Sequence, residues 1–122
     1  MSWQFNRTEA VFLQIAARLR QDILNGTYLP GEQIPPVRQL AFEASVNPNT
    51  VQRALLLLEN EGFLHARGTV GRFVTTDASL LDSAKEAARK DTIRSLIREV
   101  HALGITKEEL LLYFEEEVNR HA

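Results

Sequence analysis

The chain lacks cysteine, and its 122 residues include only one tryptophan and one methionine. Without cysteine there is no disulfide framework, no thiolate nucleophile and no zinc-finger or iron–sulfur site, so a reducing cytoplasm is the expected compartment. No apolar run approaches the ~18 residues that a membrane span needs, and the N-terminus does not resemble a signal peptide. A content of 44% hydrophobic and 25% charged residues excludes a disordered chain and is typical of one small globular domain, with or without an appendage.

Motifs for catalysis and for cofactor binding are also lacking. His65, His101 and His121 are scattered, without the spacing of a metal-binding motif such as HExxH. The chain has no GxSxG elbow, no phosphate-binding GxxxxGKS/T loop and no dinucleotide-binding fingerprint. The glutamates near the C-terminus are interpreted as a solvated helix face. The sequence therefore predicts a protein that is not an enzyme and that has neither a metal nor a cofactor.

Acidic residues are absent from two short stretches, although the formal net charge is −2. In residues 44–58 the only charged side chain is Arg53, and in residues 62–76 the only formal charges are Arg67 and Arg72. Stretches without acids can face phosphates without repulsion. On charge alone, chance clustering in a small protein explains the pattern equally well.

Hydrophobic periodicity and turn residues predict three helices, a β-hairpin and two further helices, in that order. Thr8 and Asn47 are the expected N-caps of the first and third helices, and Thr106 with Glu109 has the spacing of a capping box. Gly104 is expected to separate the last two helices. The predicted spans are helices at 8–25, 36–44 and 48–61, short strands on either side of Gly68–Gly71, a helix at 79–103 and a last helix after Thr106.

Residues 40–58 fit a helix-turn-helix, in which two helices cross at a steep angle over a very short turn. Small and apolar residues occur at the inner positions that this packing requires: Leu40, Ala41, Ala44, Val46, Val51, Ala54 and Leu55. Ser45 occupies the turn position where glycine is preferred, because the turn often needs a positive φ.

The other face of the second of these helices is polar and free of acids. Its first two turns present Asn47, Asn49, Thr50, Gln52 and Arg53. Amides and guanidinium groups can pair bidentately with adenine or guanine edges in the major groove. Taken alone, however, this face is better explained as a capped surface helix in water.

The hairpin that follows changes this interpretation, because a hairpin directly after a helix-turn-helix makes a winged helix. Glycine lets the backbone approach a phosphate or the minor groove, and arginine supplies charge there. The residues that form or flank the tip of this wing are Arg67, Gly68, Thr69, Gly71 and Arg72. The predicted fold class is therefore mainly α with a small β-hairpin, and DNA binding becomes the favoured function.

The run from Phe12 to Val74 resembles the DNA-binding domain of GntR-type bacterial transcriptional regulators. The resemblance rests on LQIAARLRQDILNGTYLPGEQIPPVRQLA, VNPNTVQRAL, LENEGFLHARG and GRFV, and the turn Asn-Pro-Asn-Thr most resembles the YtrA-like branch. It implies that Arg38 contacts phosphate or base, and that Arg67 and Gly68 contact DNA from the wing. It also implies that the polar face of the recognition helix, from Asn47 to Arg53, lies in the groove. The wing differs from the family's usual glycine-x-glycine-threonine in its spacing.

Residues 78–122, here called the tail, are expected to form a two-helix dimerisation element after a DNA-binding domain at 9–77. Symmetric dimers are the common oligomer, and paired DNA half-sites require two readers. The short tail is also what the resemblance to the YtrA-like branch implies. The alternative is that its apolar face folds back on the winged helix of the same chain. The residues expected at the dimer interface are Leu96, Val100, Leu103, Leu111, Phe114 and Val118, with Glu115–Glu117 left in water or paired with arginine.

These observations predict a homodimeric repressor that binds a double-stranded, pseudo-palindromic operator. The resemblance further implies control of a nearby operon, such as an ABC transporter operon. One alternative is a winged helix that serves as a protein-interaction module without specific DNA binding. A third hypothesis is a repressor that senses a ligand at the dimer interface or between tail and winged helix; the sequence identifies no effector.

Overall fold

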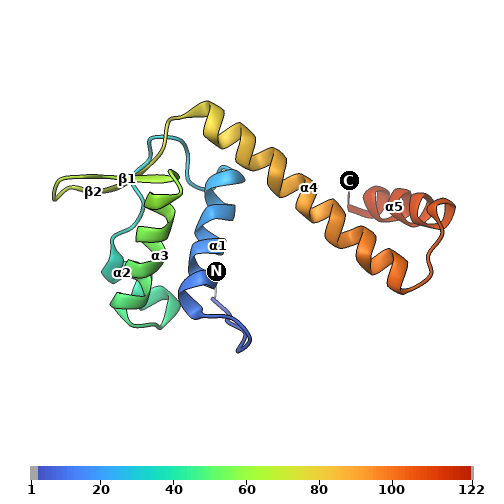
Figure 1. Cartoon of the computed structure of the whole chain (residues 1–122), viewed down its shortest axis with the longest axis horizontal. Coiled ribbons are helices and arrows are strands. Elements are labelled where there is room, and N and C mark those ends of the chain that lie inside the picture. Colours follow the sequence, from blue (N-terminus) through green and yellow to red (C-terminus); the bar gives the residue numbers. More distant parts are fainter. Residues whose placement is uncertain (1–2, 122) are drawn as a thin grey trace. The chain divides into compact units, whose positions relative to one another are not determined.

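The computed structural model describes residues 3–121, which form five helices and one two-stranded sheet (Figure 1). The order of the elements is the predicted one, helix–helix–helix–hairpin–helix–helix. The fold class is thus confirmed as a winged helix-turn-helix followed by two helices. The elements are α1 (Val11–Leu24), α2 (Val37–Ala44), α3 (Pro48–Asn60), β1 (Leu64–Arg67), β2 (Gly71–Val74), α4 (Ala78–Ala102) and α5 (Lys107–His121).

The chain divides into two compact units, with the division between Ala84 and Lys85, inside α4. The first unit therefore extends beyond the boundary expected at residue 77. The reason is that Leu81, on the first turns of α4, is buried in the core of the first unit, and Ala84 packs against that core. The second unit contains the rest of α4 together with α5.

The core of the first unit lies between α1, α2, α3 and the hairpin. Helices α1 and α3 pack against each other, and α2 packs against α3. Each fully buried aliphatic side chain stabilises the fold by roughly 1.5–3 kcal/mol relative to an exposed one. The largest fully buried side chains are Ile15, Leu19, Leu40, Val51, Leu55, Leu58 and Val74.

The turn between α2 and α3 has the conformation that the helix-turn-helix pattern requires. Ser45 is left-handed, with φ 56° and ψ 46°, at the position where glycine is preferred. Val46 is half-buried and packs against the core. Asn47 caps α3 as predicted, since its side chain accepts a hydrogen bond of 2.8 Å from the backbone N–H of Asn49. Pro48 is the first residue of the helix, where its missing N–H costs nothing.

The hairpin pairs β1 with β2 in antiparallel register, from Leu64 opposite Val74 to Arg67 opposite Gly71. The connector between α1 and α2 lies along the other side of β2. The backbone N–H of Ile34 donates to Arg72 O at 3.0 Å, and that of Val74 donates to Glu32 O at 2.9 Å. The sequence predicts only a loop in this connector. Its hydrogen bonds to the wing are seen only in the structure.

Of the predicted helix caps, the one at Thr106 forms and the one at Thr8 does not. Thr8 was expected to cap α1 but does not: the helix begins at Val11 after Ala10, and Thr8 donates from both its backbone N–H and its hydroxyl to the Asn6 side chain. The Thr106–Glu109 capping box forms in both directions, at 3.0 and 3.1 Å. The hydrogen bonds from Thr106, the backbone one first, hold the pKa of Glu109 below its ordinary value.

The second unit buries little of its apolar surface. Val100 is buried, and Ile105 and Leu110 are half-buried, whereas the other apolar side chains of α5 are exposed. After α4 the backbone turns at Gly104, with φ 69°, and the N–H of Ile105 donates to Val100 O at 3.1 Å. Within residues 3–121, no helix is long and apolar enough to cross a membrane.

Candidate nucleic-acid interface

Helix α3 carries its polar residues on the face away from the core. Asn47, Asn49 and Arg53 are exposed, and Thr50 and Gln52 are half-buried at the edges of the same surface. The first turn of α3 contains no acidic residue. The structure therefore brings together the five residues predicted for the recognition helix. The side-chain oxygen of Asn47 already accepts one hydrogen bond in capping, whereas its NH2 group is available to an outside partner.

Arg53 is supported by α1. Its guanidinium carbon lies 3.9 Å from the centroid of the Phe12 ring, a cation–π contact between the recognition helix and the first helix. Such stacking occupies one face of the guanidinium plane and leaves its edge of N–H donors available. Phe12 is not recognisable as a functional residue from the sequence, because a half-buried aromatic at helical spacing gives no sign of the partner it contacts.

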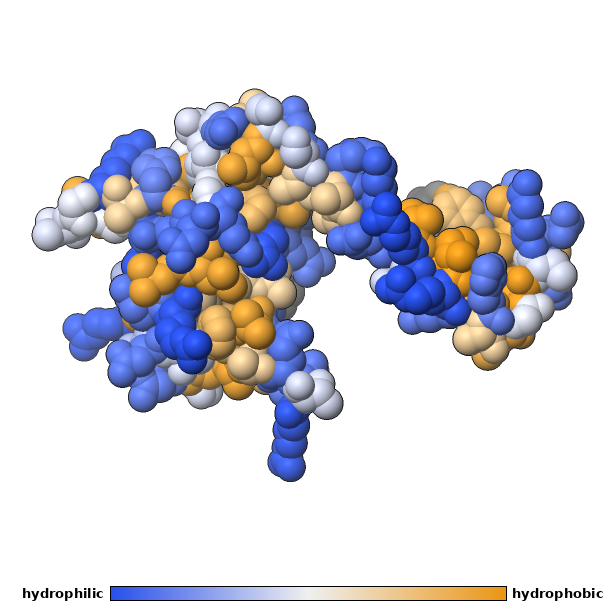
Figure 2. Space-filling view, viewed as in Figure 1, coloured by the Kyte–Doolittle hydropathy of each residue, from blue (hydrophilic) through white to orange (hydrophobic). Residues whose placement is uncertain are grey.

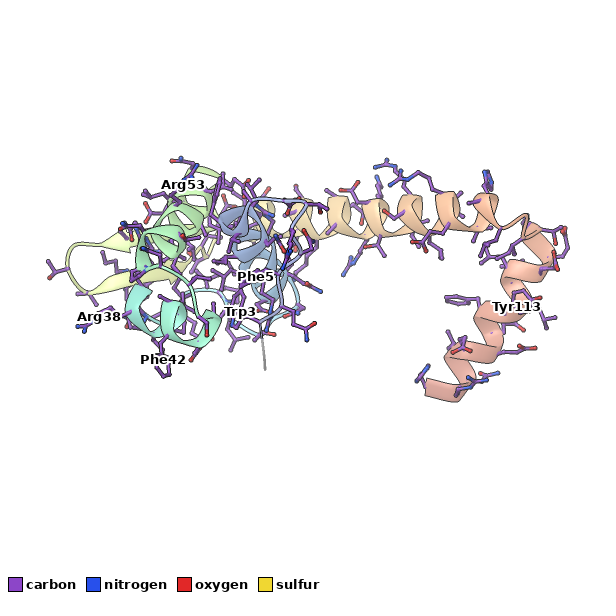
Figure 3. The ribbon with its side chains drawn as sticks, turned by 90° about the horizontal axis from the view of Figure 1, so that it is seen from below. Trp3, Phe5, Arg38, Phe42, Arg53 and Tyr113 are labelled. Carbon is purple, nitrogen blue, oxygen red and sulfur yellow. The ribbon has the colours of Figure 1, made fainter. Side chains whose placement is uncertain are left out.

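Arg38, near the start of α2, is exposed, and no ion pair forms to it among residues 3–121. Figure 3 shows Arg38 on α2 and Arg53 on α3, both on the outside of the first unit. An exposed arginine without an ion-pair partner can bind a phosphate without first giving up another contact.

The tip of the wing is exposed, and its backbone has a conformation that favours glycine. Gly68 has φ 51° and no atom within 4 Å of the position where a Cβ would be, and Thr69 and Val70 are exposed. Arg67 does not extend freely, because its guanidinium carbon lies 4.2 Å from the centroid of the Phe73 ring. Of the predicted tip residues, Gly68 and Thr69 thus lie in an exposed loop, and Arg67 is stacked on an aromatic ring.

Gln33, which the sequence analysis also missed, braces this wing from the connector. Its Nε2 donates to Val70 O at 2.9 Å. Gly71 has φ 142°, and a Cβ on it would come within 2.6 Å of the same Nε2. The backbone conformation therefore accounts for the second glycine of the wing, and a Cβ there would in addition displace the end of the Gln33 side chain.

Arg72 flanks the tip of the wing, opposite Ala66, but its side chain turns back against α3. Its Nε donates to Glu59 Oε1, and its NH1 donates to Gln52 Oε1 at 3.3 Å. The Arg72 side chain is only 16% exposed. The structure thus joins a predicted wing residue to a predicted recognition-helix residue, through a glutamate that the sequence analysis did not single out.

The residues predicted for the dimer interface lie on the tail, and the structure separates one of them from the rest. Val100 is 5% exposed and is therefore already covered within the chain. The other five are exposed, as are several neighbouring apolar side chains, and Figure 2 shows apolar residues on the surface of the tail. This apolar tail surface comprises Ile93, Leu96, Ile97, Leu103, Leu111, Leu112, Tyr113, Phe114 and Val118.

The acidic residues of the tail remain in water, as expected. Glu115, Glu116 and Glu117 are exposed, and Glu117 pairs only locally, with Arg120 at 3.4 Å and His121 at 3.5 Å. Within residues 3–121, no group of three histidine or acidic side chains is placed to hold a metal ion.

Comparison with known proteins agrees with this geometry. The model of the bacterial regulatory proteins of the gntR family matches residues 12–74, more than half of the chain. The chain is 32% identical over 111 residues to the uncharacterized HTH-type transcriptional regulator YhcF of Bacillus subtilis, covering 91% of this chain and 92% of YhcF. It is also 32% identical over 101 residues to the HTH-type transcriptional repressor YtrA of the same organism, covering 82% of this chain and 78% of YtrA.

Solved structures show the same likeness over nearly the whole chain. A GntR family transcriptional regulator from Listeria monocytogenes matches with a TM-score of 0.82 at 28% identity, covering 92% of this chain and 98% of the other. The protein therefore belongs to the GntR family of DNA-binding, helix-turn-helix transcriptional regulators, which are not enzymes, and it is a YtrA-like member.

Proposed function

We propose that this regulator is a homodimeric repressor that binds a pseudo-palindromic operator in double-stranded DNA. The observation that carries the proposal is the polar, acid-free first half of α3, which stands exposed on a buried helix-turn-helix core. In this arrangement Asn49, Thr50, Gln52 and Arg53 read base edges in the major groove. The bacterial cytoplasm, where operators lie, is the proposed compartment.

The remaining predicted contacts position the domain on the DNA. Arg38 and Arg67 bind phosphates, and the backbone at Gly68 approaches the DNA closely because nothing fills the space around it. The exposed tip residue Thr69 adds a hydroxyl to the same region. Phosphate contacts of this kind release counterions, so binding is expected to weaken steeply as the salt concentration rises.

Dimerisation through the tail is the second part of the proposal. An apolar surface that spans two helices is the usual mark of a protein interface, and a second copy is the occupant that a two-fold operator requires. The charges agree with this choice. A shallow crevice along α4 is lined by the basic residues Arg89, Lys90 and Arg94 with Glu86 and Ile93, whereas α5 carries Glu115 and Glu116 in water.

The regulated genes and the direction of regulation follow from likeness to relatives. The name of YtrA describes a repressor, and repression is proposed here on that similarity. The resemblance to YtrA-like regulators extends the proposal to a neighbouring operon, such as one encoding an ABC transporter. A protein-interaction module without specific DNA binding is the competing function, favoured only by the exposed apolar surface of the tail.

The test is a mobility shift of the purified full chain on DNA from upstream of its own gene, at several salt concentrations and with scrambled competitor. The expected result is a specific complex on one palindrome with the mass of a dimer bound to DNA. If scrambled competitor DNA abolishes binding to the upstream fragment while the protein still self-associates through its tail, the protein-interaction module is favoured instead. Transcription from the same promoter in vitro then shows whether bound protein represses it.

A further inference from the structure

Arg72 joins the wing to the recognition helix through two hydrogen-bonding partners on α3. Gln52 and Glu59 are seven residues apart, close to two helical turns, so both lie on the side of α3 that faces β2. Arg72 donates from Nε to Glu59 and from NH1 to Gln52. The side chains of Arg72 and Glu59 are 16% and 25% exposed, so solvent screens this ion pair less than an exposed one.

The contact also determines which way the Gln52 amide points. A guanidinium group has only donors, so the atom of Gln52 that meets Arg72 must be the oxygen. The NH2 group is then the end of the amide that remains for another partner. A held oxygen removes the usual ambiguity of glutamine, which otherwise presents a donor or an acceptor by rotating about its last bond.

We infer that Glu59 is a positioning residue for sequence recognition: through Arg72 it holds Gln52 with its NH2 group toward the base edge. This inference rests on the proposed role of Gln52 in base recognition. In the major groove, guanine presents two acceptors, N7 and O6, whereas adenine presents one acceptor and one donor. A glutamine whose oxygen already accepts from Arg72 presents its NH2 group and therefore favours guanine, because the bidentate contact with adenine would require the same oxygen to accept a second hydrogen bond.

Glu59 is essential to this selectivity because Arg72 has another attractive partner when DNA is bound. Without the carboxylate, the guanidinium is free to turn toward a phosphate, and the oxygen of Gln52 loses its donor. The amide can then rotate, and pairing with adenine becomes available. Glu59 thus influences the choice of base without contacting DNA itself.

The experiment is selection of binding sites from random double-stranded DNA with the full chain, followed by competition binding on the selected operator and its single-base variants. Four proteins are compared: the wild type, Gln52→Ala, Glu59→Gln and the double variant. Glu61→Gln is the matched control. Glu61 pairs with Arg20 at 2.6 Å and immediately follows α3, so the control removes the same charge and one ion pair without touching Arg72.

The wild type is expected to prefer guanine over adenine at one position of each half-site. Gln52→Ala abolishes that preference, and Glu59→Gln reduces it by about fivefold or more, the effect expected of one redirected hydrogen bond. The double variant behaves as Gln52→Ala alone, because both changes act through one side chain. Glu61→Gln keeps the wild-type preference, although loss of an acid raises the affinity of both charge variants for all DNA.

Two different results would identify which claim fails. If Gln52→Ala changes no base preference, the proposed role of Gln52 is wrong. If Gln52→Ala abolishes the preference but Glu59→Gln leaves it intact, or if the two effects add, the positioning role is overturned. Thermal unfolding of each variant checks folding. Should Glu59→Gln prove unstable, Arg72→Lys gives the second test, because lysine has one nitrogen where two now donate, and it is expected to show the same loss of preference.

Discussion

The guanidinium of Arg53 stacks over the ring of Phe12 at 3.9 Å, so a side chain of the recognition helix is held by a residue forty-one positions earlier in the chain. Leucine at position 12 keeps most of the apolar packing but removes the π face. We expect Phe12→Leu to weaken operator binding by about 0.5–1 kcal/mol, the usual range for an exposed cation–π contact. Competition binding measures this, with thermal unfolding to correct for lost packing. Equal affinity of variant and wild type would show that stacking does not orient Arg53.

Arg38 and Gln52 are expected to respond differently to truncation, because one is assigned to phosphate and the other to a base. Arg38→Ala should weaken binding to all DNA sequences alike and reduce the slope of log affinity against log salt by about 1. Gln52→Ala should cost ~1–3 kcal/mol on the operator and much less on scrambled DNA. The measurement is a salt series of affinities on both DNAs. A change of sequence preference in Arg38→Ala would reverse its assignment.

Both wing glycines have a positive φ, but only at Gly71 would an added Cβ also meet a neighbouring side chain. Gly71→Ala forces a residue with a Cβ to φ 142° and displaces the Nε2 of Gln33, which now lies 2.6 Å from the Cβ position. Gly68→Ala meets only open space at φ 51°, so its cost is limited to about 1–2 kcal/mol of left-handed backbone strain. We expect Gly71→Ala to lower both thermal stability and operator affinity more than Gly68→Ala does. The opposite order would show that Gln33 does not brace the wing.

The apolar tail surface is tested by placing a charge on it. Phe114 is 59% exposed, so Phe114→Glu should leave the monomer folded while placing an unpaired carboxylate in the proposed dimer interface. Sedimentation should show a monomer, and operator affinity should fall by at least tenfold because one reader is lost. Asn119→Glu, which adds the same charge at a polar position five residues from Phe114 and about 140° around α5 from it, is the control. A Phe114→Glu protein that remains dimeric would place the interface elsewhere.

The parts of the fold that the sequence predicts are those fixed by neighbours along the chain. The helix-turn-helix follows from a turn residue at Ser45, a cap at Asn47 and apolar residues one turn apart, all within a short stretch. The capping box at Thr106 is equally local. Thr8 fails as a cap because α1 begins only at Val11, after Ala10, so Thr8 lies before the capping position; residue type alone does not settle where the helix begins.

The parts that the sequence does not predict depend on contacts between distant segments. The place of Arg72 next to the wing tip follows from the sequence, but the direction of its side chain is decided by Glu59 and Gln52 on another element. Nothing in the sequence indicates that Gln33 supports the wing, because its partner is a backbone group, the carbonyl of Val70. Val100 is predicted at a dimer interface, but it is already buried within its own chain. Composition and periodicity carry no information about such pairings.

The connector that runs along β2 also limits how this sheet can associate. Hydrogen bonds from Ile34 and to Glu32 occupy the side of β2 that β1 leaves open. An uncovered strand edge is a template on which another chain can extend the sheet, and proteins commonly cover such edges to prevent aggregation. The connector provides this cover along β2. With β1 on one side and the connector on the other, β2 has no free edge on which a second chain could add a strand and start aggregation.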